Sequence, residues 1–479
     1  MPRRRILPLA IVAVALALAA GALVAQRRGS GPVLSATVIG APLAPLLPDG
    51  TGGMLLLAVD PHASSAVGLP PFDPRLSPDA VPPIRPSGDC AISGGVRPAG
   101  PPYRLQAVDA RTGRLARATD LGATWIAAPA PGGRLLALDP LLCLVRSVDP
   151  AAGVTATRPF HAGIDFARMA LGDPVSGHVF VAGIHYSALT DNEVPEVALL
   201  DGRSGRPRAT AQPALAPQSG GHALGVEPLS LAVAPTRHQL FMFDADGVES
   251  IFDTRSLRPL ASLRLPLAIE HPLVDERTGR LFGLGRPTAL SGSWMPGSWT
   301  QGQPDPPGTL AMIDLRTGQL LGAAVRERLL DRAGELALGA DGRVYVASVA
   351  TRGILVLDGR GGAIRQIILV GASPAHLAID APRQRLYAAF GDDRQIAVLD
   401  MRRGTRVRTI DAGATVLDLA VDPVSGHLAA VTASLDTSPS DRWAWLPGWL
   451  RRWFPASQSE TPPGRVRYML RLLDPATSG

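Results

Sequence analysis

Short aliphatic runs of about six residues, separated by polar turns, recur along most of the chain. The clearest stretch has runs at 375–380 (AHLAID), 385–390 (RLYAAF), 395–400 (QIAVLD) and 405–410 (TRVRTI). The turns between them are APRQ, GDDR and MRRG, and the fourth run is more polar than the others. Four runs of this length joined by turn clusters predict a four-stranded antiparallel meander.

The same unit returns eight times. In each copy the third run ends in Asp and passes into a turn that usually carries Gly and Arg; these residues are Asp109, Asp149, Asp201, Asp253, Asp314, Asp358, Asp400 and Asp474. A repeat of roughly 40 residues indicates an array of supersecondary units. A meander cannot bury both of its faces alone, and radial packing of copies solves this. We therefore predict an all-β fold, a single β-propeller over residues 33–479, with eight blades and seven as the alternative.

The two ends of the repeat region predict how the ring closes. The last copy ends just after its third run, at 474–479, so it lacks an outer strand. Val33–Gly40 (VLSATVIG) is similar to fourth runs such as Ile367–Gly371 (IILVG). We expect residues 33–40 to complete the eighth blade, so that strands from both termini close the ring.

At residues 371–413 and 334–371 the repeat resembles the YVTN-type bacterial β-propeller repeat. The matching pattern is G-x-x-P followed by an apolar run ending in Asp, then RLY, then a third run ending in Asp. The letters YVTN are absent; VYVAS at 344–348 and LYAAF at 386–390 are nearest. The resemblance implies an extracytoplasmic propeller, and its members mostly have no assigned activity.

Residues 1–32 precede the propeller. An apolar run at 6–25 follows Arg3, Arg4 and Arg5 and is long enough to span a bilayer as one helix. We expect it to anchor an extracytoplasmic propeller in the cytoplasmic membrane, the alternative being a cleaved signal peptide and secretion. An oxidising location would permit a disulfide between Cys90 and Cys143, the two cysteines of the chain; two buried thiols are the alternative.

Charge argues against nucleic acid as a partner. The chain has 47 basic and 41 acidic residues, a net charge of +6. Five Arg lie within residues 1–32 and no acid precedes Asp49, so residues 33–479 carry about +1. A near-neutral propeller lacks the basic surface that binding to phosphate backbones requires.

Four insertions interrupt the repeat, at 61–102, 184–194, 286–308 and 434–465. All fall between second and third strands, which places them on one face of the predicted propeller. A further excursion at 211–226 joins two blades on the same face. Binding function is concentrated in such loops on rigid scaffolds.

The last insertion contains WAWLPGWLRRWF, with four of the seven tryptophans. Its candidate contact residues are Trp443, Trp445, Trp449, Trp453, Phe454, Arg451 and Arg452. This composition suits a lid packed over the propeller mouth, a protein-contact hot spot or a membrane interface. All three interpretations stay open.

Alignment of the innermost strands places one polar position per blade near the axial mouth. It predicts Arg168, Ser230, His271, Glu335, His376 and Asp418 in blades 3 to 8. Two imidazoles and two carboxylates from consecutive blades, His271, Glu335, His376 and Asp418, could hold a divalent metal or act as general acid and base. The competing interpretation is that polar residues line a hydrated channel and have no catalytic or metal-binding role. Apart from this possible metal, we expect no cofactor.

Other candidates are expected to be structural. The turn aspartates can accept hydrogen bonds from turn amides. His178, His238 and His427 precede second strands, which predicts a local role. Two functions therefore remain: a non-enzymatic module that binds an unidentified protein or cell-envelope ligand through the decorated face, or a lactonase-like or metal-dependent hydrolase acting at the axial mouth.

Overall fold

The alternation of aliphatic runs and turns produces the strands that the pattern predicts. The computed structural model describes residues 33–39, 41–42, 47–48, 54–60, 103–122, 126–139, 144–159, 164, 166–187, 192–214, 228–287, 309–326, 333–390, 393–436 and 465–475. In the copy used for the sequence prediction the four strands are β27 (Pro374–Asp380), β28 (Arg385–Phe390), β29 (Gln395–Asp400) and β30 (Thr405–Asp411). Each lies within one residue of its expected bounds.

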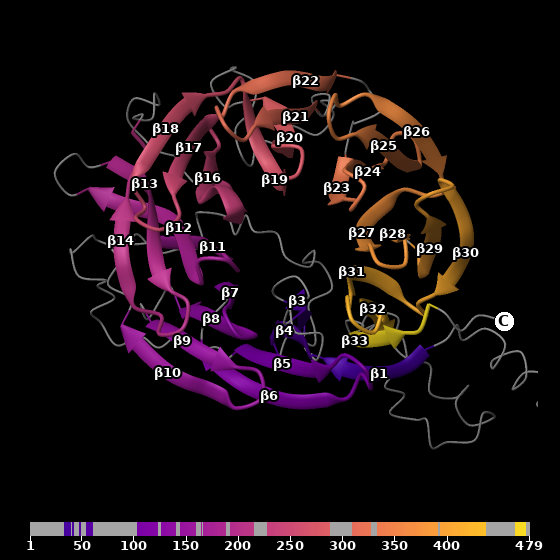
Figure 1. Cartoon of the computed structure of the whole chain (residues 1–479). Helices are drawn as coiled ribbons and strands as arrows, with labels where there is room; N and C mark the ends of the chain where they lie inside the picture. Colours follow the sequence, from indigo (N-terminus) through magenta and orange to yellow (C-terminus); the bar gives the residue numbers. More distant parts are fainter. Residues whose placement is uncertain are drawn as a thin grey trace, which may run out of the picture.

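Eight antiparallel sheets are arranged around a central axis (Figure 1). Blade 1 has the short strands β2 (Ala41–Pro42) and β3 (Leu47–Pro48), then β4 (Met54–Asp60), β5 (Tyr103–Asp109) and β6 (Leu115–Gly122). Blade 2 has β7 (Ile126–Ala130), β8 (Arg134–Asp139), β9 (Leu144–Asp149) and β10 (Gly153–Pro159). Blade 3 has β11 (Phe166–Gly172), β12 (His178–Ser187), β13 (Asn192–Asp201) and β14 (Pro207–Ala211). Blade 4 has β15 (Pro228–Ala234), the 3-10 turn η2 (Pro235–Arg237), β16 (Gln239–Asp244), β17 (Val248–Asp253) and β18 (Pro259–Arg264).

The remaining blades repeat this order. Blade 5 has β19 (Leu267–Asp275), β20 (Arg280–Pro287), β21 (Thr309–Asp314) and β22 (Leu320–Arg326). Blade 6 has β23 (Ala333–Leu338), β24 (Arg343–Ser348), β25 (Gly353–Asp358) and β26 (Ile364–Leu369). Blade 7 is β27–β30, and blade 8 has β31 (Thr415–Val421), β32 (Leu428–Asp436), β33 (Arg465–Leu473) and β1 (Val33–Ile39). The fold is an all-β propeller with eight blades of four-stranded antiparallel sheet, and the seven-blade alternative is wrong.

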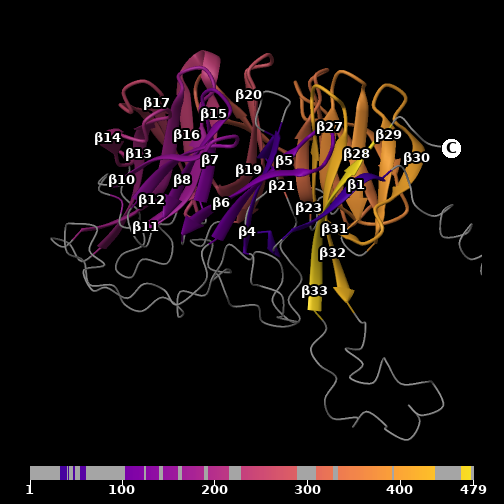
Figure 2. The same cartoon turned by 90° about the horizontal axis from the view of Figure 1, so that it is seen from below.

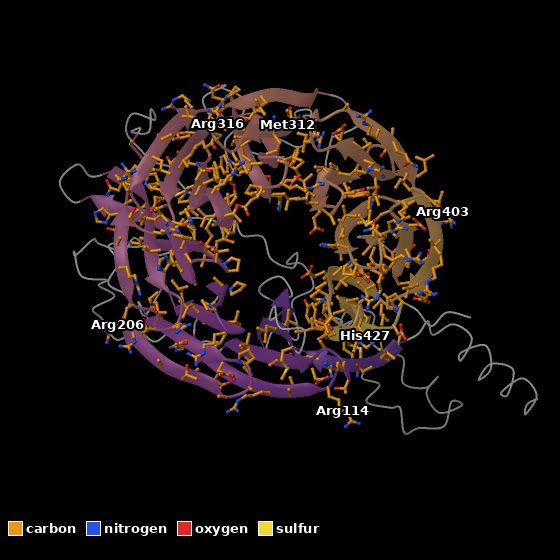
Figure 3. All side chains as sticks on the ribbon, in the orientation of Figure 1. Arg114, Arg206, Met312, Arg316, Arg403 and His427 are labelled. Atoms are coloured by element: carbon orange, nitrogen blue, oxygen red, sulfur yellow. The ribbon has the colours of Figure 1, made fainter. Side chains whose placement is uncertain are left out.

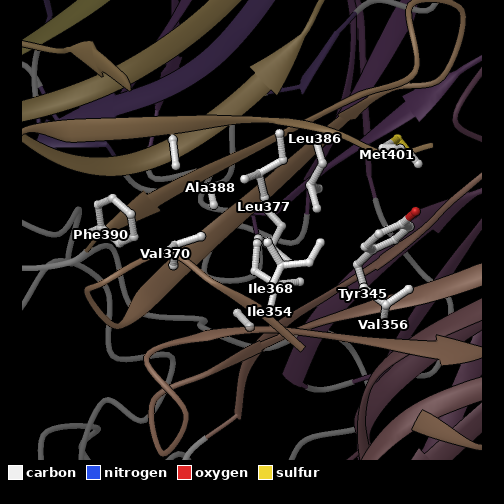
Figure 4. Packing of buried hydrophobic residues seen from close by; sticks show 13 residues of the cluster. Tyr345, Ile354, Val356, Ile368, Val370, Leu377, Leu386, Ala388, Phe390 and Met401 are labelled. Atoms are coloured by element: carbon white, nitrogen blue, oxygen red, sulfur yellow. The ribbon is translucent and has the colours of Figure 1, made fainter. Parts of the chain in front are cut away.

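Hydrophobic packing lies between blades, because each sheet presents apolar side chains on both faces. Eight clusters of buried residues are found among the described side chains, one at each junction between consecutive blades. Figure 4 shows the junction of blades 6 and 7, where Tyr345 and Ile354 pack against Leu377, Leu386 and Met401. Each blade therefore depends on both of its neighbours for burial.

Blade 8 combines segments that are distant in the sequence. β1 pairs antiparallel with β33, with Ala36 opposite Arg471 and Val38 opposite Met469. At the junction of blades 8 and 1, Leu55 and Leu57 of β4 join the cluster that contains Leu470 of β33. The first and last blades thus share a buried core, like every other consecutive pair.

The turn after each third strand is fixed by its aspartate. In blade 1, Asp109 Oδ1 accepts hydrogen bonds from the amides of Arg111 and Thr112 and from the Thr112 hydroxyl, and the Gly113 amide donates to the Asp109 carbonyl. Equivalent bonds occur at Asp149, Asp201, Asp253, Asp314, Asp358 and Asp400, which confirms the predicted Asx-type role for seven of the eight aspartates. The turn arginines Arg114, Arg206 and Arg403 point outward around the ring (Figure 3).

These turns also dock on the preceding blade. Gly113 has φ +65°, and a Cβ there would overlap the Ser35 side chain of β1 and lie 3.1 Å from Cβ of Leu472 in β33. Glycine is therefore required here for two reasons: the backbone is left-handed, and a side chain would prevent the close approach of the two blades. The sequence pattern predicted the turn but not this contact.

Two departures from the predicted unit occur. The expected inner strand of blade 1 is divided into β2 and β3, which both pair with β4. In blade 3 the predicted insertion at 184–194 largely continues the sheet, with Tyr186 opposite Glu193. The hairpins β12–β13 and β32–β33 are longer than the six-residue strands β28 and β29. β32 and β33 extend past the other blades on one side of the ring (Figure 2).

Several predicted features fall outside the described residues: the apolar segment 6–25, Cys90 and Cys143, insertion 61–102, and most of insertions 286–308 and 434–465 with the tryptophan-rich segment. Within the described part of the chain, no helix has the length and apolar character needed to cross a membrane.

Candidate functional site

The inner strands of blades 3 to 8 each contain a shift of register against the second strand, which changes the side chain that faces the axis. In blade 7 the register shifts between Pro374 and His376, so His376 pairs with Ala389. In blade 8 the shift lies between Val416 and Asp418, and Asp418 pairs with Val431. A bulge re-aims the residue next to it, which is why such positions recur near functional sites. The structure thus places these two residues at equivalent positions, as the sequence alignment predicted.

Two of the six predicted inner positions are displaced. In blade 3 it is Met169, not Arg168, that pairs with Ala182 after the bulge. In blade 5 the pairing Glu270–Leu284 takes the equivalent position, and His271 lies in the bulge with φ +49° and an exposed side chain. An extra residue in the bulge defeats an alignment based on strict alternation. His271 is therefore not equivalent to the other candidates.

Glu335, His376 and Asp418 form the inner-strand cluster. Glu335 Oε2 lies 3.8 Å from His376 Nδ1, and the two side chains keep 37% and 31% of their surface exposed. Asp418 Oδ1 accepts a 2.8 Å hydrogen bond from the Leu419 amide. Three adjacent blades thus supply two carboxyl groups and one imidazole from their inner strands.

Burial shifts the two interacting groups toward neutral forms. Desolvation raises the pKa of Glu335 to about 7; the Leu377 amide opposes this shift and the Asp418 charge adds to it. Desolvation also lowers the pKa of His376, while the Asp418 charge opposes that shift. Both shifts favour the uncharged forms, a protonated carboxyl group and a neutral imidazole. Groups that titrate near the working pH are suited to general acid–base chemistry.

Glu335 also has a structural role. Its Oε2 accepts a 2.7 Å hydrogen bond from the Leu377 amide in the bulge region of the next blade. Ser230 makes a comparable link, donating a 2.6 Å hydrogen bond to the Ile269 carbonyl in blade 5. The inner polar positions therefore tie successive blades together, which is sufficient to account for polar residues there. Among the described residues, no three His, Cys, Asp or Glu side chains are arranged to hold a metal ion.

The predicted local role of the three turn histidines is wrong in part. His178 Nδ1 lies 3.0 Å from the Thr254 carbonyl of the next blade, and His427 Nδ1 lies 3.2 Å from the Ala110 carbonyl of blade 1. His238 contacts Arg255 within blade 4, with 2.6 Å between ring Nε2 and guanidinium Nη2. Two of the three thus link neighbouring blades, and no sequence signal distinguishes that from a role within the turn.

A second pair of perturbed acids lies in blade 4, where sequence reasoning missed them. Glu249 is fully buried, neither carboxyl oxygen has a hydrogen-bond partner, and desolvation raises its pKa to about 8. Desolvation also raises the pKa of Asp244 to about 7; the Val248 amide opposes that shift and Asp246 adds to it. Asp244 ends β16 and Glu249 lies on β17, so neither belongs to the inner strand of its blade.

The strand pairing defines an eight-bladed β-propeller that carries this polar cluster on its inner strands. No protein-family model matches the chain, and no curated protein matches it. Among solved structures the chain is similar to BamB from Moraxella catarrhalis, with 14% identity and a TM-score of 0.43 over 69% of this chain and 88% of that one. It is also similar to the computationally designed Ika8 protein, with 14% identity and a TM-score of 0.47 over 68% and 86% of the two chains.

A third similar structure belongs to the mitotic checkpoint complex, with 16% identity and a TM-score of 0.39 over 55% of this chain and 68% of that one. Likenesses this distant carry no functional argument. The assignment of the fold rests on the strand pairing of the chain itself.

Proposed function

We propose that the protein is a binding or scaffold module that presents one face of a rigid propeller to a protein or cell-envelope partner. The proposal rests on where the repeat is interrupted. Long connections leave from the equivalent second-to-third-strand position in three blades, after Asp60, Pro287 and Asp436, and in blade 3 the β12–β13 hairpin itself is lengthened. The corresponding connections of blades 4 and 6 are short turns, Ala245–Gly247 and Val349–Arg352.

The opposite face supports the same conclusion. Its turns are short in every described blade and are held by the Asp-centred hydrogen bonds and the contacts between blades described above. Variation in length is thus confined to one face of a scaffold whose other face is fixed. A rigid frame with variable loops on one side is the usual architecture of a binding surface.

We further propose that the propeller is exported and anchored in the cytoplasmic membrane by residues 6–25, with secretion after cleavage as the alternative. The uninterrupted apolar run after three arginines supports this. The repeat is proposed to be of the YVTN type, on the motifs at 334–413. The β1–β33 pairing is proposed to act as the clasp that closes the ring, on the strength of its register and the shared core of blades 1 and 8.

The binding proposal is tested by replacing residues 437–464 with Asn-Gly in the full chain. Asp436 and Arg465 are directly paired, so a two-residue hairpin turn can join them. We expect the melting transition to stay close to that of the wild type, while chemical crosslinking in the membrane of origin no longer gives the wild-type adducts. A matched control replaces the blade 5 segment 288–308 in the same way.

The outcomes separate two of the three interpretations of the tryptophan-rich segment, partner contact and packed lid. Loss of specific adducts with an unchanged melting transition supports partner contact. A large fall in melting temperature favours the packed lid. If neither replacement changes the adducts, the decorated face is not the binding surface and the proposal fails. Alkaline phosphatase fused after residue 475 tests export, since the enzyme is active only where its disulfides form.

A second candidate function is acid–base catalysis in the axial channel, favoured by the Glu335–His376 pair. A carboxyl group titrating near pH 7 beside a neutral imidazole can exchange protons with a bound ester or lactone. The test compares ester and lactone hydrolysis by the wild type, Glu335→Gln and His376→Asn. Gln can still accept the Leu377 hydrogen bond, so its fold is expected to persist. Equal rates in all three proteins would exclude the cluster as a catalytic site.

A further inference from the structure

A cavity of about 410 Å³ opens between blades 7 and 8, on the face of the short turns. Its polar lining consists of Arg383, Arg385, Arg408 and the Tyr387 side chain. Val398, Val407 and Pro475 supply the apolar wall, and no carboxylate is found among the described residues of the lining. We call this cavity the Arg385 pocket. It lies opposite the decorated face and is independent of the function proposed above.

The equivalent place between blades 6 and 7 is occupied by the turn of blade 7, and it shows which groups the equivalent side chains bind. Strand pairing makes Arg343, Tyr345, Val356 and Gln366 the counterparts of Arg385, Tyr387, Val398 and Arg408. There the turn of blade 7 supplies two oxygen acceptors. Arg343 Nη1 donates to the Met401 carbonyl at 3.4 Å, and Gln366 Nε2 donates to the Gly404 carbonyl at 3.1 Å. These side chains therefore present donors to oxygen atoms.

The same relation recurs elsewhere in the ring. His178 and His427 occupy the position of Arg385 in their blades, and each approaches the carbonyl of the residue after the next blade's turn aspartate. In blade 8 the residue after that aspartate is Pro475, which lines the pocket and accepts no hydrogen bond from Arg385 among the described residues. Here the equivalent position opens onto a cavity.

The donors around this cavity are cationic and incompletely used. Arg408 replaces the neutral Gln366, and its Nη2 is buried without a hydrogen-bond partner. Arg383 is held by Asp380 through Nη1 at 3.2 Å and by the Ser425 carbonyl through Nη2 at 2.9 Å. Burial, the largest effect, raises the pKa of Tyr387 to about 12; the Asp380 charge adds to the rise, and Arg385, Arg408 and Arg383 oppose it. Tyr387 is therefore a protonated donor among three guanidinium groups.

We propose that the Arg385 pocket binds the phosphate group of a small organic phosphate. Guanidinium forks match the tetrahedral oxygens of phosphate, and Arg385 and Arg408 approach from different strands of one sheet face. The apolar wall and a volume at the lower end of the range for ligand sites leave room for a small organic group beyond the phosphate. Asp380 does not compete, because its side chain is fully buried against Arg383.

The test is calorimetric titration of the full chain with inorganic phosphate and, separately, with glycerol phosphate, in buffer of fixed ionic strength. We expect saturable binding at one site per chain, tighter for glycerol phosphate if the apolar wall contributes. Arg385→Ala and Arg408→Gln should each weaken binding about 10-fold or more, the usual effect of losing a charged hydrogen bond. The matched control, Gln366→Ala between blades 6 and 7, should bind like the wild type.

Arg408→Gln installs the residue that the equivalent place between blades 6 and 7 already carries, so it is expected to fold. If Arg385→Ala does not fold, the proposal is tested with Val407→Asp together with Arg408→Gln. Val407 is half exposed, so a carboxylate there is expected to leave the fold intact and to repel the phosphate. The proposal is wrong if inorganic phosphate or glycerol phosphate does not bind the wild type. So does binding that Arg408→Gln and Val407→Asp leave unchanged, which would indicate nonspecific attraction to the surface arginines.

Discussion

The surroundings of Glu249 predict how the free energy of unfolding depends on pH. The side chain lies between blades 4 and 5: a Cβ added to Gly318 would lie 3.6 Å from Glu249 Oε1 and would overlap the side chains of Ile251 and Leu263. Both carboxyl oxygens lack hydrogen-bond partners, and burial raises the pKa from 4.5 to about 8. The folded protein therefore holds a proton that the unfolded chain releases above pH 4.5.

The sign follows from proton linkage. Stability contributed by a raised carboxyl pKa is greatest below 4.5, falls as pH rises from 4.5 to 8, and is constant above 8. Each pH unit in that window costs about 1.4 kcal/mol, so the full penalty approaches 5 kcal/mol as an upper limit. Replacing the acid with Met, which fills similar space among apolar neighbours, should remove the penalty.

The assay is urea unfolding of wild type and Glu249→Met at pH 5, 6, 7 and 8. We expect the variant to gain stability over the wild type as pH rises, by several kcal/mol at pH 8. Glu249→Gln is the control: it removes the titration but keeps a polar group, so it should share the changed pH dependence without the full gain. Parallel pH profiles for wild type and Glu249→Met would refute the assignment of a buried, unpartnered carboxyl group.

Three further predictions address the turns, the ring junction and the channel. Gly113→Ala should destabilise the fold by about 2–4 kcal/mol and Gly132→Ala by about 1 kcal/mol. Both glycines have positive φ, but a Cβ at Gly132 meets nothing within 4 Å. Denaturant unfolding of both variants checks this, and equal losses of stability would contradict the contact between Gly113 and Ser35. Asp201 has its pKa lowered to about 2, since hydrogen bonds from Ser204 and Arg208 outweigh its desolvation. Its contribution is present above about pH 4 and lost as pH falls toward 2, so Asp201→Asn should lose less stability than wild type in acid unfolding titrations, and an unchanged acid profile would argue against it. Glu335→Gln should gain on the wild type between pH 4.5 and 7, because burial raises the pKa of Glu335 to about 7; thermal melts at pH 4.5 and 8 with the same relative stability would show that the carboxyl is not shifted.

The strands and the blade number were predictable because their causes are local. The run QIAVLD is buried along β29 and ends in Asp400, whose Oδ1 accepts the amides of Arg402 and Arg403. Alternation and turn chemistry of this kind are carried within a few residues of sequence. The strand from 33 to 39 was recognisable by its similarity to other outer strands, although its partner lies at the far end of the chain.

The failures arose where the cause is not visible in the alternation of apolar and polar residues. His271 was aligned with His376, but the bulge in β19 gives that place to Glu270. Glu249 lies in VESIFD, of which the first five residues are buried. Because both faces of this sheet are packed, the strand has no exposed side, and the sequence has no alternation that distinguishes a buried acid from an exposed one. Neither the bulge nor the packing of Gly318 over Glu249 leaves a trace in the local pattern.

The pairing of β1 with β33 has a consequence for the timing of folding. β1 is made first, yet the strand it pairs with follows roughly 430 residues later. At ribosomal rates of about 5–20 residues per second, its segment waits for about 20–90 s before its partner exists. During that interval the apolar faces of blades 1 and 7 that blade 8 will cover are also exposed. The growing chain is therefore most vulnerable to mispairing just before β33 is made, when seven blades are complete and β1 still lacks its partner.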